Sequence, residues 1–256
     1  MEETPPPPSL ETPEVPSTSL LNRLTNVFVS PTEVFDEIKT SRPNSANWIV
    51  PLVMAMIAGI IYTLVVFSQP AVIHRMQEAQ EKKFQDMVAA GKMTQQQADQ
   101  TIAAVQKYMS PGFMKLMGCL GSLFMNVITL FLIALVFWLV GKRAFHSDLN
   151  YTRSLEAVGV SMMINVLGII VAMLLAVIYG NIFMTLGPAL LVSHFDAGNK
   201  VHRILSALNL TSLWYVAVLS LGLARLTGAS FLKSAAWLYA IWATLTLGPI
   251  LIFSGK

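Results

Sequence analysis

No charged residue occurs between Leu116 and Val140, a run of 25 consecutive residues. A run of this length is sufficient for a helix to cross a bilayer with some tilt, because the hydrocarbon core is about 30 Å thick and a helix rises about 1.5 Å per residue. Inside lipid, a helix also satisfies its own backbone hydrogen bonds. Four further apolar runs are long enough: residues 48–67, 158–183, 210–226 and 234–254. The sequence therefore predicts an all-α polytopic membrane protein with five transmembrane helices.

The composition supports a membrane protein and argues against nucleic-acid binding. Of the 256 residues, only 12% are charged and 54% are hydrophobic, whereas soluble proteins average about 25% charged residues. The formal net charge is +3, and the basic residues are scattered rather than gathered into the patch that nucleic-acid binding requires. Cys119 is the single cysteine, so no disulfide can form within the chain.

Residues 1–19 are predicted to form a disordered, proline-rich tail. Pro5–Pro8 favour an extended polyproline conformation, and few apolar residues are available to pack. The tail also lacks the basic residues and the short apolar run of a cleavable signal peptide. We therefore expect the first span to act as an uncleaved insertion signal.

Residues 20–47 are predicted to form two short amphipathic helices before the first span. Apolar residues recur at helical spacing, and Ser30-Pro31-Thr32-Glu33 supplies the serine, proline and glutamate of a capping box that begins the second helix. Such helices either lie in the membrane interface or pack on the cytoplasmic surface of the protein itself. The sequence leaves both arrangements open.

Residues 71–109 are predicted to form a helical hairpin inserted into the five-span domain, residues 48–256. Gly91 ends a first amphipathic helix, and Thr94–Gln97 supply the capping box of a second. The apolar stripe of the pair is expected to serve packing rather than ligand binding. Basic residues close to the span ends favour a cytoplasmic N-terminus, which places the hairpin and the C-terminus outside.

Three segments carry a resemblance to a known family: Phe28–Ile38 followed by Trp48 and Pro51; Phe137–Lys142 followed by Phe145 and Leu155–Val160; and Leu208–Trp214 followed by Gly222–Ala224, Leu226–Gly228 and Lys233–Ala236. In this order and spacing the chain resembles the Yip domain family, the Ypt/Rab-interacting membrane proteins. The resemblance extends roughly from Leu21 to Phe253. The long hairpin with Met93–Gln97 is similar to that of the bacterial branch.

This resemblance implies five transmembrane helices, a cytoplasmic N-terminus and an exposed C-terminus. For a bacterial member it implies a location in the inner membrane. Eukaryotic members are implicated in vesicle traffic and membrane shaping through Rab GTPases, which a bacterium without Rab proteins cannot use directly. The resemblance therefore implies the fold rather than the activity.

Two sets of residues within the spans are candidate contact positions. The first set consists of pairs of small residues four positions apart, which let helices approach closely. These pairs are Ala55 with Gly59, Gly118 with Ser122, and Ala236 with Ala240. They serve either packing within the chain, which we favour, or homo-oligomerisation. The second set is polar and comprises Asn126, Thr129, Ser161 and Asn165. Hydrogen bonding between helices is the default interpretation of these four, and a polar groove is the alternative.

The sequence predicts no catalytic, cofactor or metal site. Boundary residues aside, spans one, two, three and five contain no Asp, Glu, Lys, Arg or His, which disfavours ion-coupled transport. Cys119 has no acid or histidine near it in the sequence, and no G-x-S-x-G, H-E-x-x-H or phosphate-binding glycine loop occurs. His194, Asp196 and His202 form one cluster of potential metal ligands, but their spacing matches no zinc motif.

We therefore expect a non-enzymatic membrane adaptor or organiser. Its partners would be the lipid bilayer and a protein that binds residues 20–39 or 71–109. The alternative is a transporter of a small solute or lipid, or a subunit of one, with a groove lined by the four polar residues. An intramembrane enzyme is the third reading.

Overall fold

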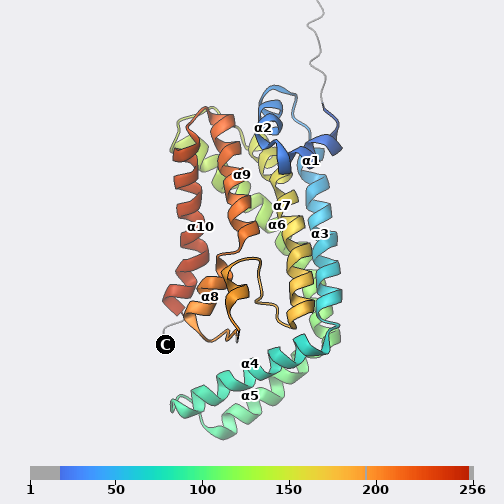
Figure 1. The fold of residues 1–256 in the computed structure, drawn as a ribbon, viewed down its shortest axis with the longest axis vertical. Helices are drawn as coiled ribbons and strands as arrows, with labels where there is room; N and C mark the ends of the chain where they lie inside the picture. Colours follow the sequence, from blue (N-terminus) through green and yellow to red (C-terminus); the bar gives the residue numbers. More distant parts are fainter. Residues whose placement is uncertain (1–17, 194, 254–256) are drawn as a thin grey trace, which may run out of the picture.

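The computed structural model describes residues 18–193 and 195–253, and these residues are mainly α-helical (Figure 1). The predicted disordered tail, residues 1–19, lies outside the described residues except for its last two. Five helices are long and apolar enough to cross a membrane: α3 (Ala46–Val66), α6 (Pro111–Arg143), α7 (Tyr151–Tyr179), α9 (Leu210–Thr227) and α10 (Phe231–Phe253). The prediction of an all-α protein with five candidate spans is confirmed.

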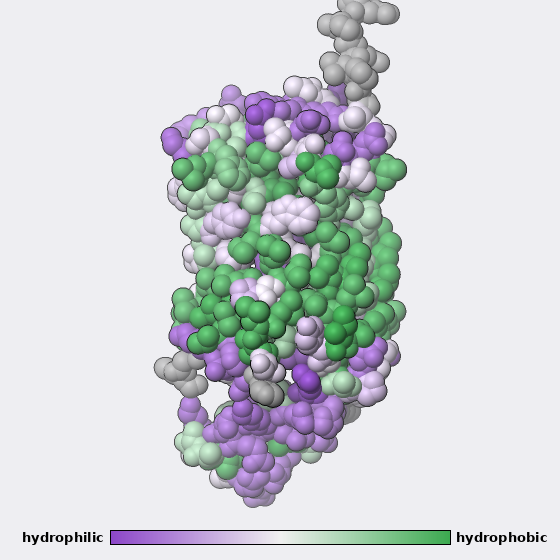
Figure 2. Space-filling view, in the orientation of Figure 1, coloured by the Kyte–Doolittle hydropathy of each residue, from purple (hydrophilic) through white to green (hydrophobic). Residues whose placement is uncertain are grey.

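The remaining helices lie at the two ends of this bundle (Figure 1). At one end are α1 (Leu20–Val29) and α2 (Pro31–Thr40), and at the other is the hairpin of α4 (Pro70–Ala89) and α5 (Gln95–Tyr108). A 3-10 helix (Pro188–Leu191) and α8 (Lys200–Ala207) connect α7 to α9. The surface between the two ends is a broad apolar belt (Figure 2). The chain therefore has an apolar middle and two polar ends.

Helix α7 forms the centre of the bundle. Every residue from Ser154 to Ile164 is buried. A Cβ added to Gly159 would lie 2.4 Å from the Cα of Trp48, so the backbones of α3 and α7 are in direct contact there. Only glycine permits this approach.

The observed bounds of α7 differ from the expected span, residues 158–183. The helix begins at Tyr151, because Asn150 caps it by accepting a hydrogen bond from the N–H of Arg153 at 2.8 Å. It ends at Tyr179, because Gly180 takes a left-handed conformation with φ +59°. The first two turns of α7 therefore carry charged residues, which hydropathy alone does not assign to a span.

Small residues bring α3 and α6 together. A Cβ added to Gly59 would lie 2.0 Å from the Oγ of Ser122, and one added to Gly118 would lie 2.6 Å from the Cγ2 of Thr63. Ala55, which is on α3 with Gly59, is fully buried. Of the two predicted pairs, Gly59 of α3 and Ser122 of α6 thus meet each other, whereas Gly118 of α6 faces Thr63 of α3. The third pair, Ala236 and Ala240 of α10, is exposed.

Helices α1 and α2 pack on the end of the bundle through their apolar faces. Val27, Phe35 and Ile38 are each 0% exposed. The ring of Phe35 lies against α9, because a Cβ on Gly222 would be 2.8 Å from its Cε1. Phe28 adds an edge-to-face contact with Trp214, with ring centroids 5.8 Å apart. The buried faces of both helices are thus part of the main core.

The two predicted capping boxes have different outcomes. The one at Ser30 is wrong, because the Ser30 side chain makes no capping hydrogen bond. Ser30 alone separates α1 from α2, and its N–H closes α1 by donating to the carbonyl of Asn26 at 2.7 Å, so α1 constrains its geometry as well. The box at Thr94 is confirmed, because Thr94 and Gln97 exchange both hydrogen bonds.

Candidate functional site

A fully buried carboxylate lies near the start of α7, at the end of the bundle that carries α1 and α2. Glu156 is 0% exposed. Its Oε1 accepts hydrogen bonds from the N–H of Asn44 at 2.7 Å and from the side-chain amide of Asn47 at 2.9 Å, and its Oε2 accepts one from Arg153 at 3.0 Å. These donors satisfy a charge that would otherwise be very costly to bury.

Arg23 of α1 extends this network to the N-terminal helices. Its side chain is almost fully buried and donates to the side-chain oxygen of Asn47 at 3.3 Å and to Glu37 of α2 at 2.7 Å. Asn47 therefore bridges Arg23 and Glu156, accepting from one and donating to the other. We call Arg23, Glu37, Asn47, Arg153 and Glu156 the buried network. It joins α1, α2, α3 and α7.

The charges of the buried network balance. Two arginines face two carboxylates, and the second arginine, Arg153, also donates to the carbonyl of Ser41. Burial raises the pKa of Glu37, but hydrogen bonds from Arg23 and Thr18 outweigh it and hold that pKa below its usual value. Glu37 is therefore charged at neutral pH. Two buried polar atoms, Arg23 Nε and Ser41 Oγ, have no hydrogen-bond partner in the described part of the chain.

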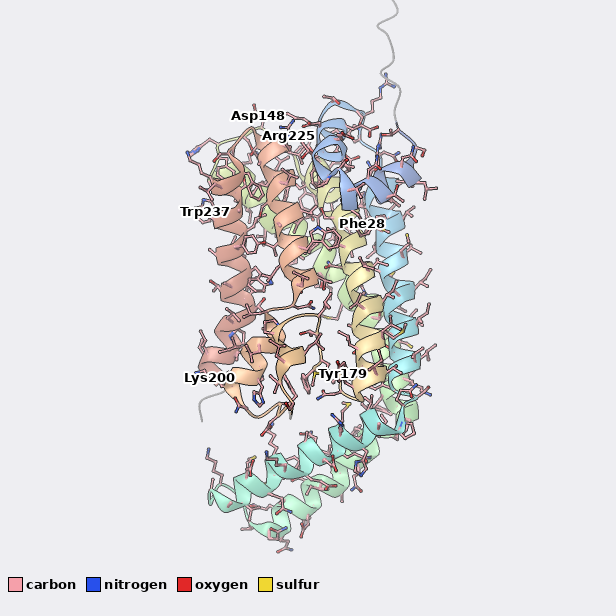
Figure 3. All side chains as sticks on the ribbon, in the orientation of Figure 1. Phe28, Asp148, Tyr179, Lys200, Arg225 and Trp237 are labelled. Carbon is pink, nitrogen blue, oxygen red and sulfur yellow. The ribbon has the colours of Figure 1, made fainter. Side chains whose placement is uncertain are left out.

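A second, exposed contact ties α2 to α9. Arg225 donates from Nε to Asp36 Oδ1 at 2.7 Å and forms a second hydrogen bond to Oδ2. Lys39 donates to the carbonyl of Arg225 at 2.9 Å. These residues line a groove of about 380 Å³ that reaches Phe231 at the start of α10. Figure 3 labels Arg225 at this end of the molecule. The α1–α2 pair is thus held by a buried and an exposed set of charges.

The comparison with protein families agrees with this architecture. A family model described as the Yip1 domain matches residues 25–253. The chain belongs to the Yip1 domain family. No curated protein and no solved structure matches it. The matched region of the Yip1 domain contains all five candidate spans and four members of the buried network, while Arg23 lies two residues before it. The predicted family resemblance is confirmed.

Within the Yip1 domain, the four polar candidates are placed differently from one another. Ser161 is buried and donates to the carbonyl of Ala157 in its own helix at 2.7 Å. Asn126 likewise donates to the carbonyl of Ser122 at 2.7 Å. Thr129 is exposed, and Asn165 is partly buried. None of the hydrogen bonds between described residues links one of the four to another.

Asn165 has a different polar neighbour on α9. The hydroxyl of Tyr215 is buried and has no hydrogen-bond partner of ordinary geometry among the described atoms. The amide of Asn165 lies toward it without completing such a bond. Asn165 and Tyr215 are thus polar neighbours on α7 and α9.

Two of the three potential metal ligands, Asp196 and His202, lie in the described part of the chain. His194 lies outside the described residues. Asp196 pairs with Lys82 of the hairpin at 2.7 Å, and its N–H donates to Nδ1 of His202 at 3.0 Å. The hydrogen bond from Lys82 and that from the N–H of Gly198 lower the pKa of Asp196. Asp196 thus connects the α7–α9 segment to the hairpin, and no group of three metal ligands occurs in the described ranges.

Sequence reasoning missed the buried network. Glu156 lies two residues before the expected third span, residues 158–183, so it falls in the polar loop that precedes that span. Arg23 falls in the apolar stripe of α1, between Leu20 and Leu24, where a charged residue breaks the pattern. That break is the signal in the sequence, because a charge on a buried helix face requires a buried partner.

Proposed function

We propose that this Yip1 domain is a non-enzymatic membrane adaptor or organiser that presents α1 and α2 to a partner. The observation that carries the proposal is the buried network, which joins Arg23 and Glu37 through Asn47 to Glu156. A surface held in one shape loses less conformational entropy when it binds. Glu156 and Arg23 are enclosed by protein, whereas a reactive group has to face an open pocket. The network therefore suits a structural role.

Contact with lipid is part of the same proposal. Leu24 and Val27 of α1 face the bundle and are buried, whereas Leu21 and Val29 are 70% and 77% exposed. Helix α1 runs across the end of the bundle rather than along it (Figure 1). An amphipathic helix in this position contacts the headgroup region with its exposed apolar side chains. Packing on the bundle and contact with the membrane are therefore compatible.

We place the α1–α2 end in the cytoplasm, with the chain in a bacterial inner membrane. Basic residues flank the spans at this end: Lys142 and Arg143 in the last turn of α6, Arg225 in the last turn of α9, and Lys233 near the start of α10. Lys and Arg close to span ends favour the cytoplasmic side. In a Cys119→Ala background, a cysteine replacing Lys92 should react with an impermeant thiol reagent added outside, and one replacing Lys142 should not. Reversed labelling would overturn this orientation.

The hairpin of α4 and α5 provides a second proposed contact surface on the other side. Its inner apolar residues are buried and so are not available to a partner: Val72 and Ala98 are each 1% exposed. Its outer faces are polar (Figure 2). An ion pair between Lys82 and Asp196 connects it to the α7–α9 segment. A polar helical hairpin fixed to the bundle is suited to recognising a protein or a membrane surface.

Photocrosslinking in native membranes tests the adaptor role. A photoreactive residue would replace Val29 of α1, Gln96 of α5 or, as the control, Leu132, which is 55% exposed within the apolar belt. We expect a discrete protein adduct from position 29 or 96 and lipid adducts alone from position 132. The same adducts from all three positions, or protein adducts from none, would contradict the proposal.

Transport is the second candidate function, and the Tyr215 hydroxyl is the observation that favours it. This buried hydroxyl makes no hydrogen bond of ordinary geometry within the described residues, although the side chain of Asn165 is close enough to influence it, so it is a polar group inside the bundle that a solute could use. Replacing Tyr215 with phenylalanine separates the two functions. An adaptor should retain its crosslinks, whereas a transporter should lose solute flux in proteoliposomes.

A further inference from the structure

A cleft of about 750 Å³ lies where α4 leaves the bundle, at the end opposite α1 and α2. Its walls combine apolar side chains, such as Phe67 and Ile73, with the cationic side chains of Arg75 and Lys115. In Figure 3, the first turn of α4 lies close to the labelled Tyr179 at the end of α7. A cleft in this size range accommodates a ligand as large as a lipid headgroup.

The two cations of the cleft are free to bind an anion. Arg75 and Lys115 form no ion pair or side-chain hydrogen bond with any described residue. The cleft also contains Glu78, but its Oε1 lies 3.3 Å from Nδ1 of His74 in the next turn. The formal charge of the lining is therefore positive. The first turn of α4 packs against the C-terminus of α7, since a Cβ added to Gly180 would lie 3.1 Å from the Cβ of Ala71, and the Nε of the exposed Arg75 would lie 3.9 Å from it.

Two helix N-termini add to this positive potential. Pro70 and Pro111 line the cleft and are the first residues of α4 and α6. Neither helix has a side-chain cap at its N-terminus. The first N–H groups of a helix are unpaired within it and carry a partial positive charge, so they favour a nearby anion.

The position of the cleft along the bundle indicates the source of the anion. Lys115 immediately precedes the uncharged run that begins at Leu116, and Phe67 follows the last residue of α3. Beside them, Leu64, Leu116 and Leu120 are 45%, 59% and 41% exposed on α3 and α6. Figure 2 shows the apolar belt giving way to polar surface near this end. The cleft thus lies at the level where lipid phosphates meet acyl chains.

We propose that this cleft binds the phosphodiester headgroup of an anionic phospholipid. Arg75 of α4 and Lys115 of α6 contact the phosphate from two sides, and the acyl chains run along the exposed leucines of α3 and α6. The bound lipid joins the hairpin to the bundle. This site is at the opposite end of the bundle from the buried network, so it does not depend on the proposed adaptor role.

Native mass spectrometry of the full chain in detergent, titrated with phosphatidylglycerol, tests this site. The test variant is Arg75→Gln/Lys115→Gln. The matched control, Lys83→Gln/Lys92→Gln, removes the same charge from exposed positions of the hairpin region outside the cleft. We expect the test variant to bind about 25-fold more weakly, roughly fivefold for each cation. The control and Arg75→Lys, which keeps the positive charge, should bind like the parent protein.

Three results would overturn the proposal. Equal affinity of the parent and test variants would show that the two cations do not hold the lipid. Equal affinity for phosphatidylcholine would show that the headgroup charge is not recognised. Displacement of the lipid by excess inorganic phosphate would assign the cleft to a soluble anion.

Discussion

Replacing Arg23 with leucine should release α1 and α2 from the bundle without unfolding it. The substitution removes the charged hydrogen bond to Glu37 at 2.7 Å and the weaker one to Asn47 at 3.3 Å. A hydrogen bond that involves a charged group contributes about 1.5–3 kcal/mol, and the long bond from the Arg23 guanidinium to Asn47 lies toward the low end of this range. Arg23 Nε has no partner, so its loss offsets part of that sum. The net cost should be about 2–4 kcal/mol.

Hydrogen exchange of the α1 and α2 amides in lipid nanodiscs measures this cost. A loss of about 2–4 kcal/mol corresponds to exchange that is about 30- to 700-fold faster, because about 1.4 kcal/mol changes an equilibrium tenfold. The amides of α7 should be unaffected. Arg42→Leu is the matched control, since Arg42 is exposed and outside the buried network. Equal exchange in the Arg23 and Arg42 variants would refute the reasoning.

Three further predictions concern pH, packing and capping. Glu37 has a lowered pKa when docked, so its contribution to docking is complete above its unperturbed value of 4.5 and is lost as the pH falls through the lowered value. After correction for the intrinsic pH dependence of amide exchange, the protection of α1 should therefore fall at acidic pH in the parent protein, and Glu37→Gln should lack this part of the dependence. Gly59→Ala places a Cβ 2.0 Å from Ser122 Oγ and should lower the free energy of unfolding in detergent by about 1–3 kcal/mol. Adding Ser122→Ala should restore part of this loss. Ser30→Ala should cost less than about 0.5 kcal/mol because no cap is lost, whereas Thr94→Ala should destabilise the hairpin by about 0.5–2 kcal/mol in an exchange measurement.

The five candidate spans and the family were accessible from the sequence because each depends on local pattern. In lipid, the backbone hydrogen bonds of an uncharged run such as Leu116–Val140 are all made within the run when it forms a helix. The capping box at Thr94 acts within one helix turn, and its two hydrogen bonds form as the spacing predicts. At Ser30 the same pattern fails, because that residue also has to end the preceding helix.

The buried network could not be derived in the same way because its members are far apart in the chain. Glu156 and Asn47 are 109 residues apart, yet they form a hydrogen bond of 2.9 Å. Only the packing of α3 on α7 brings them together. The cationic cleft could not be derived from local pattern either, since Arg75 and Lys115 come from different helices. A charge inside an apolar stripe, as at Arg23, indicates that a buried partner exists but does not identify it.

The central claim is that α1 and α2 are a fixed part of the bundle and not a loosely tethered amphipathic segment. Spin labels on cysteines replacing Glu33 of α2 and Lys233 of α10, in a Cys119→Ala background and in lipid nanodiscs, test it directly. A docked pair gives one narrow distance distribution, which broadens when Arg23→Leu is added and stays narrow with Arg42→Leu. A broad distribution in the parent protein, or one that Arg23→Leu leaves unchanged, would contradict the claim.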